Sequence, residues 1–152
     1  MVSPELLRRF PIFSGLSMDN INELAKSAEE QSIERDHIIN REGDELKYFY
    51  LLLDGEVAIV SFLPKNGDEV VHSTIGVGEL FNWSALIPPH TATASTKIVV
   101  PSRVVAFDAV VLRKKFSEDC VFGYQMVMKI AQVIRDRLNA LLIETMAYHV
   151  KQ

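Results

Sequence analysis

The residues that could do chemistry gather in one stretch, from Gly78 to Thr93. This stretch carries an indole at Trp83, an imidazole at His90 and several hydroxyl groups, and Pro88-Pro89 interrupts it. It is too short to be a stable helix by itself, so we expect one or two helical turns held between strands. The amide groups of such a first turn lack partners within the helix and can face a ligand. The alternative is a plain connection that crosses one end of a β-barrel.

Other candidate chemistry is sparse. The four histidines show no metal-ligand spacing: His37, His72, His90 and His149. A cupin-like enzyme normally has a paired-His and Glu motif on one strand, and this motif is absent from the sequence. Three aspartates lie at turns or helix caps, where local backbone hydrogen bonds explain them: Asp54, Asp68 and Asp108. We therefore predict no catalytic residues, no metal site and no enzymatic activity.

Composition narrows the class of protein. A chain of 152 residues fits one domain and buries about 70% of its unfolded surface. The net charge is -4 and the basic residues are dispersed, which argues against direct contact with nucleic acid. Cys120 is the only cysteine, so an internal disulfide is excluded and a reducing compartment is favoured. No apolar run approaches the ~20 residues that cross a bilayer, and no secretory signal opens the chain. We predict a cytoplasmic protein without a membrane partner.

The elements that must position the Gly78–Thr93 stretch follow a simple order. Residues 1–32 read as N-terminal helices: a turn over Ser3–Arg9, then a helix capped by Ser17 that ends on the solvated Glu29–Gln31. Residues 33–107 are short apolar runs separated by turn signals. Asp54-Gly55 in particular predicts a two-residue hairpin. This spacing predicts a mainly β body, a roll or jelly-roll barrel of about eight strands.

The last part, residues 108–152, reads as helical. Asp108 caps a first helix over Ala109–Phe116, and a helix of about thirty residues follows Asp119. Apolar residues on that helix recur at alternating steps of three and four, which indicates a heptad seam. At ~45 Å the helix is longer than a domain of this size can cover, so we predict a parallel homodimer rather than packing on its own β-body alone. The predicted interface residues are Val127, Ala131, Ile134, Leu138 and Leu141.

This order of helices, β-roll with a short inserted cassette, and long helix resembles the cyclic nucleotide-binding domain family, which includes the catabolite activator regulators. The resemblance covers nearly the whole chain. It is carried by Phe13-Ser14-Gly15-Leu16, by Ile39–Asp44 and by Tyr50–Val57, which look like the family's glycine-marked strand turns. It implies a regulatory domain that senses a small molecule. Transcriptional members carry a helix-turn-helix after the long helix, and no such DNA-binding segment lies within these 152 residues.

The family's phosphate-binding cassette reads roughly Phe-Gly-Glu-Leu-Ala-Leu, then a loop, then Arg-Ser/Thr-Ala. This chain matches it with Phe81–Leu86 and then with His90-Thr91-Ala92. Trp83 stands in place of the sugar-binding carboxylate, and His90 in place of the phosphate-binding guanidinium. Losing both contacts costs ~3–6 kcal/mol, so we expect no binding of cyclic AMP by the usual contacts. The ligand-binding residues that the resemblance implies are Phe81, Asn82, Trp83, Ser84, Ala85, His90, Thr91 and Ala92.

Several alternatives stay open. Aligning Gly78-Glu79-Leu80 with the family's Gly-Glu-Leu restores a carboxylate but loses the match at Phe81 and at Ala85-Leu86. Trp83 either stacks on a ligand or fills an empty pocket. Three functions are candidates. The first is a sensor module whose effector is a cyclic nucleotide or another small anionic molecule. The second is a dimerisation or protein-interaction domain that binds no ligand, and the cupin-like enzyme comes last.

Overall fold

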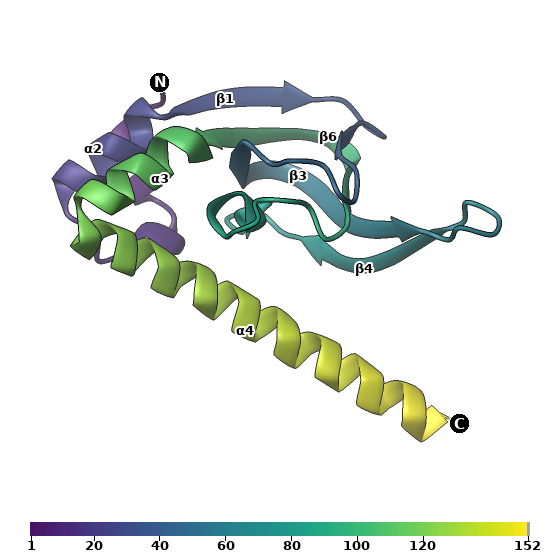
Figure 1. Cartoon of the computed structure of the whole chain (residues 1–152). Helices are drawn as coiled ribbons and strands as arrows, with labels where there is room; N and C mark the ends of the chain where they lie inside the picture. The colour runs from purple at the N-terminus through teal and green to yellow at the C-terminus, as the bar shows by residue number, and fades with distance from the viewer. Residues whose placement is uncertain (152) are drawn as a thin grey trace.

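Helices from both ends of the chain lie at one end and along one side of a rolled β-sheet (Figure 1). The computed structural model describes residues 1–151. The N-terminal helices are α1 (Pro4–Arg8), the short 3-10 helix η1 (Pro11–Phe13) and α2 (Met18–Lys26). The C-terminal helices are α3 (Ala109–Glu118) and α4 (Cys120–Lys151). This arrangement confirms the predicted fold class of a β-roll with N-terminal helices and a long C-terminal helix. The domain was predicted to run to Gln152, which lies outside the described residues.

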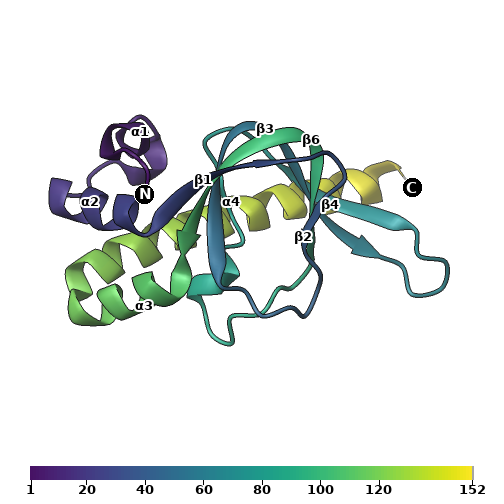
Figure 2. The same ribbon diagram turned by 90° about the horizontal axis from the view of Figure 1, so that it is seen from above.

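The sheet has six strands in the order β1-β6-β3-β4, with β2 paired to β6 and β5 paired to β3. Their bounds are β1 Ala28–Ile33, β2 Ile38–Asn40, β3 Tyr48–Phe62, β4 Glu69–Ile75, β5 Leu80–Phe81 and β6 Ser95–Asp108. The long antiparallel pair of β3 and β6 forms the central part of the roll, and Figure 2 shows how the pair curves around the interior. A hairpin that contains Gly67 joins β3 to β4, where the Leu63 N–H donates to the Asp68 carbonyl at 2.8 Å.

Two sequence expectations about the strands are wrong. Asp54-Gly55 does not form a hairpin, because both residues lie within β3, which pairs with β6 before and after them. The register with β6 shifts at this point, so the pair of residues is a bulge that bends the strand. Pro101-Ser102, which by its residue types also predicts a turn between two strands, lies instead within β6. Four expected strands therefore merge into two, which explains six strands instead of about eight.

The end of α2 also differs from expectation. The helix stops at Lys26, and Glu29–Gln31 belong to β1 rather than to a solvated helix end. Ser27 terminates the helix, since its hydroxyl donates to the Leu24 carbonyl at 2.8 Å. Ala28 then pairs with Phe107 of β6. The local spacing was compatible with a helix, but pairing with a strand about eighty positions later decided the outcome.

An aromatic cluster joins the N-terminal helices to the roll. Phe49 and Phe107 are fully buried and stack with ring centroids 4.8 Å apart, and Phe13 of η1 meets Phe107 edge-on at 5.8 Å. This packing fixes the helical end of the molecule against the roll.

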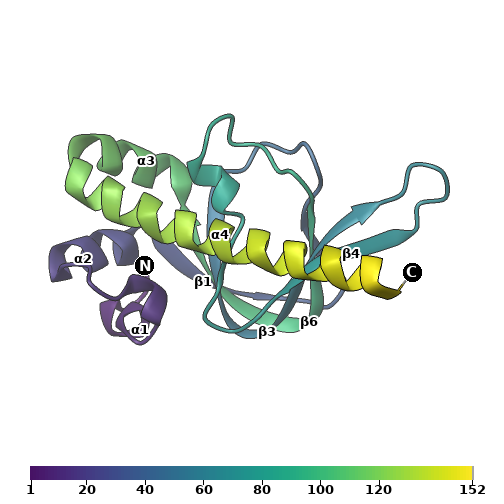
Figure 3. The same cartoon turned by 90° about the horizontal axis from the view of Figure 1, so that it is seen from below.

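Helix α4 crosses one side of the roll (Figure 3), and its C-terminal end lies away from the strands (Figure 1). As predicted, Asp108 caps α3, accepting from the Val111 N–H at 3.1 Å, and a long helix follows Asp119. Phe122, Met126 and Ile130 of α4 are buried in the core, whereas Leu138 and Leu141 are 56% and 45% exposed. The first half of α4 is thus part of the fold, and its second half leaves apolar surface uncovered. No helix within residues 1–151 has the length and apolar character needed to span a membrane.

Candidate functional site

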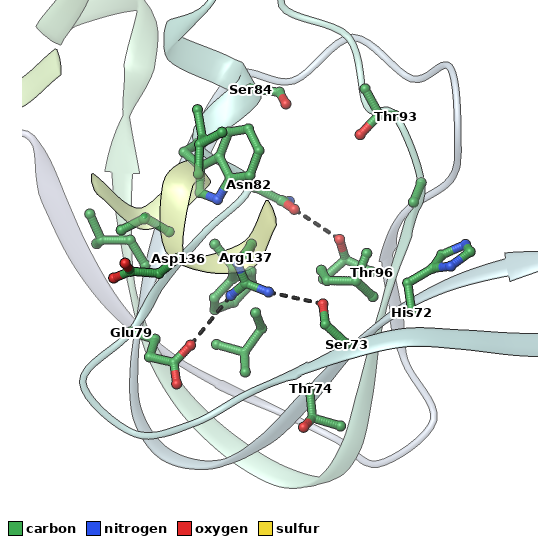
Figure 4. Close-up of a pocket in the computed structure, with 18 of the residues that line it drawn as sticks. His72, Ser73, Thr74, Glu79, Asn82, Ser84, Thr93, Thr96, Asp136 and Arg137 are labelled. Carbon is green, nitrogen blue, oxygen red and sulfur yellow. Dashed lines mark hydrogen bonds and ion pairs between the residues drawn. The ribbon is translucent and has the colours of Figure 1, made fainter. Parts of the chain in front are cut away.

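A pocket of about 790 Å³ lies between the β-roll and α4 (Figure 4). Its walls come from β4, from the turn before β5, from the cassette that follows, and from residues 133–144 of α4. A volume of this size matches the pockets that hold small molecules and cofactors in other proteins. The pocket is closed on one side by a helix, so anything bound in it contacts both the sheet and α4.

The inner wall of the pocket is apolar and rigid. Ile75, Leu80 and Phe81 are at most 1% exposed, and the Phe81 ring stacks on Tyr50 with centroids 5.1 Å apart. Leu80 and Phe81 are held in place because β5 pairs with β3. This wall can hold the flat or aliphatic part of a ligand.

Asn82 begins the cassette in a left-handed conformation, with φ at 58°. Both ends of its side-chain amide are hydrogen-bonded: its NH2 donates to the Asn40 side-chain oxygen at 2.8 Å, and its oxygen accepts from the Thr96 hydroxyl at 2.8 Å. Asn40 in turn donates to the Ala94 carbonyl at 3.2 Å. Asn82 lines the pocket, but its hydrogen bonds tie the two ends of the cassette loop to β2 and β6. We therefore assign it a positioning role.

This assignment predicts a measurable loss of stability. Asn82→Gly keeps the left-handed backbone accessible and removes two side-chain hydrogen bonds, so we expect a loss of about 1–2 kcal/mol in the free energy of unfolding. Thr96→Val removes one of the same bonds. In urea denaturation the double variant should therefore lose less than the sum of the two single variants. Simple additivity would show that the two side chains do not share a bond.

The structure brings some of the predicted ligand-binding residues to the pocket and not others. Phe81, Asn82, Trp83, Ser84 and Ala92 line it, and Trp83 opens the short 3-10 helix η2 (Trp83–Leu86) expected between strands. The three remaining predicted ligand-binding residues do not line the pocket. Ala85 is buried in the core. The backbone carbonyl of His90 accepts a hydrogen bond from the Leu46 N–H at 2.8 Å, and Thr91 forms an isolated β-bridge with Glu45.

Sequence reasoning missed the charged residues of the pocket, and Arg137 of α4 is the main one. Its Nη1 donates to the Ser73 hydroxyl at 2.9 Å, and its Nη2 lies 3.3 Å from the Glu79 carboxylate (Figure 4). Burial lowers the pKa of Arg137, while the Glu79 carboxylate opposes that change. The side chain is 20% exposed and, like arginines generally, stays protonated. The pocket thus contains a guanidinium, and the carboxylates of Asp136 and Glu144 border it in addition to that of Glu79. In the alignment that matches Phe81–Leu86 to the cassette, none of these groups stands at the family's sugar-binding or phosphate-binding position.

A signal for Arg137 was present in the sequence. Residues 126, 130, 133 and 137 follow each other at helical steps of three or four, and the first two are buried in the core. Continuing that line one turn beyond Val133 puts Arg137 on the side of α4 that faces the protein. The long helix was read instead for its heptad seam, which runs along a neighbouring line.

Taken together, the pocket can hold an uncharged ring against its apolar wall and a polar or charged group near Arg137. Hydroxyl groups of Ser73, Ser84 and Thr93 also border it. No group of three or more residues able to bind a metal ion occurs in the described part of the chain. The arrangement is suited to reversible binding.

Comparison with known proteins identifies relatives with this architecture. The family model of the cyclic nucleotide-binding domain matches residues 30–119, which is more than half of the chain. A protein of Rhodopseudomonas palustris assigned as a potassium channel is 23% identical over 137 residues, 90% of this chain. The chain spans about a third of the length of that relative.

Solved structures agree with the family match. A Geobacter metallireducens protein assigned as a cyclic nucleotide-binding protein superposes with a TM-score of 0.81 at 28% identity, covering 91% of this chain and 99% of its own. The sensor domain of the transcriptional regulator DNR from Pseudomonas aeruginosa gives a TM-score of 0.70 at 20% identity, over 89% of this chain and 90% of its own. The Thermus thermophilus Catabolite Activator Protein gives 0.69 at 19%, over 89% and 63%.

Proposed function

We propose, from the premise that this chain belongs to the cyclic nucleotide-binding domain family, that it is a regulatory module sensing a small anionic molecule in the pocket between roll and α4. The ligand would place an apolar or ring portion against Phe81 and Trp83 and an anionic portion toward α4. The outcome of binding would be a changed position of α4. The pocket of about 790 Å³, whose wall is shared by sheet and helix, is the observation that carries this proposal.

The cassette supports a ligand-binding mode different from the usual one. Asn82 takes a left-handed backbone at the position aligned with the family's Gly, as the alignment that puts Trp83 at the carboxylate position requires. Gly78, the glycine of the alternative alignment, also has a positive φ of 87°, so the backbone conformation is compatible with both alignments. His90, aligned with the phosphate-binding Arg, lies outside the pocket wall. We therefore infer that cyclic AMP, if bound, is not held by the usual cassette contacts.

A ligand screen tests this function. Cyclic mononucleotides, cyclic dinucleotides, nucleosides and common charged and uncharged metabolites would be surveyed by thermal shift, and each positive compound measured by calorimetry. A compound present at one hundred times its Kd should add ~2.7 kcal/mol to the free energy of unfolding. We expect at least one member of the panel to bind with one-to-one stoichiometry. Failure of every compound, charged or neutral, would contradict a sensing function.

The second candidate is a dimerisation domain that binds no ligand, favoured by the uncovered apolar residues along α4. Val127, Leu138 and Leu141 are each 45–56% exposed, and Ala131 is exposed beside them. Ile134 is half-buried against the core of its own chain. We propose that this seam pairs with a second copy in either case, because a sensor that moves α4 needs a partner to read the movement.

A further inference from the structure

We propose that Arg137 binds an oxyanion of the ligand, and that Glu79 is a built-in competitor for the same guanidinium. This inference rests on the proposed function and names the group in the pocket that would select the ligand.

Arg137 lines the pocket and has N–H donors without acceptors among the described residues. A guanidinium carries five N–H groups, and within residues 1–151 its contacts are one bond from Nη1 to Ser73 and one from Nη2 to Glu79. Its Nε is buried and has no acceptor among the described residues. A buried N–H without a partner is unfavourable. Nε and Nη2 lie on one edge of the planar group, and this edge is the one that a carboxylate or phosphate engages with two parallel bonds.

The contact between Arg137 and Glu79 is easily exchanged. The Glu79 side chain is 53% exposed, and the 3.3 Å separation from Nη2 is longer than is usual for a charge-assisted bond. Exposed ion pairs of this kind add little to stability. Asp136 and Glu144 also border the pocket, so the surroundings of Arg137 are acidic. A ligand oxyanion is therefore expected to replace Glu79 at the guanidinium rather than join it.

The exchange would act directly on α4. Arg137 belongs to α4, whereas Ser73 lies on β4 and Glu79 on the turn before β5. In Figure 4 the arginine reaches from the helix across the pocket to both of them. When an oxyanion displaces Glu79, the helix loses one of its attachments to the roll and gains a contact with the ligand. Ligand chemistry and helix position are thereby linked through one side chain.

The experiment compares calorimetric affinities across matched ligands and variants. Cyclic AMP and adenosine share base and sugar, but only cyclic AMP has a phosphate. Succinate is the probe for binding of a carboxylate. Arg137→Gln should weaken binding of the oxyanion by about tenfold to a hundredfold and leave adenosine unchanged. Arg135→Gln, an exposed residue two positions earlier on the same helix, is the matched charge control and should have little effect. If Arg137→Gln weakens the binding of cyclic AMP, Arg137 recognises phosphate, and if it weakens the binding of succinate, Arg137 recognises carboxylate.

Glu79→Gln is the decisive variant because its expected effect has the opposite sign. Removing the competitor should tighten oxyanion binding by about twofold to fivefold, an outcome that damage to the fold would not produce. The inference is overturned if neither oxyanion distinguishes wild type from Arg137→Gln, or if Glu79→Gln weakens binding. If a neutral compound from the wider screen still binds, only this inference fails. If nothing binds at all, the proposed function fails with it.

Discussion

Replacing Leu138 and Leu141 together by glutamate should convert the proposed dimer to a monomer. Both side chains are about half exposed on the chain alone, and they lie on the seam predicted from the heptad spacing. A fully buried leucine contributes about 1.5–3 kcal/mol. Because about half of each side chain is already covered in the single chain, four of them, two from each protomer, correspond to ~3–6 kcal/mol, about two to four decades in the dimer Kd. Sedimentation velocity across a concentration series measures the change.

Two further variants make the dimer test specific. Leu138 and Leu141 also border the pocket, so Val127→Glu with Ala131→Glu, on the seam but outside the pocket wall, should give the same loss of mass. Asn139→Glu with Ile143→Glu adds equal charge on the opposite face of α4, where both residues are exposed, and should leave the mass unchanged. A monomeric wild type, or equal dissociation in all three variants, would contradict a dimer built on this seam.

Gly55→Ala should be the most damaging single change in the roll. Gly55 has φ at 108°, and a Cβ added there would lie 2.6 Å from the Ser102 Cβ and 2.8 Å from the Ser102 Cα of β6. Because part of the obstruction is backbone, the two central strands must separate to admit a methyl group. Strain and overpacking together are expected to cost about 3 kcal/mol or more, measured by urea denaturation.

Gly67→Ala is the control for this prediction. Gly67 also has a positive φ, 74°, but nothing lies within 4 Å of an added Cβ. Its substitution should cost only the conformational penalty of about 1–2 kcal/mol. Equal losses at the two positions would mean that the close approach of β3 and β6 at Ser102 does not limit packing.

The parts of the fold that the sequence predicted correctly are those set by local chemistry. Ser17 and Asp108 cap helices because their side chains accept from backbone N–H groups three residues later. The bulge at Asp54-Gly55 and the start of β1 at Ala28 depend on pairing with β6, a strand more than forty residues away. Neither could be read from nearby residues, since the same dipeptide serves a hairpin or a bulge.

Some residues of the candidate site could likewise be predicted from the sequence, and others could not. The η2 turn and the pocket-lining Phe81 and Trp83 followed from the order of residues in the cassette. Arg137 did not, because its place in the pocket depends on how α4 is rotated against the roll. Glu79 was considered only as part of an alternative alignment, whereas the structure gives it a role through its contact with Arg137. Spacing within a motif was informative, and contacts between distant elements required coordinates.

The occupation of the pocket can be observed at Trp83, the only tryptophan in the chain. A ¹H–¹⁵N spectrum therefore contains a single indole N–H signal, and that signal comes from the wall of the pocket. During titration with a compound that binds by calorimetry, we expect this signal to shift and to saturate with the same Kd as the heat. An indole signal that stays in place while the heat saturates would put the ligand elsewhere and contradict a sensing pocket between the roll and α4.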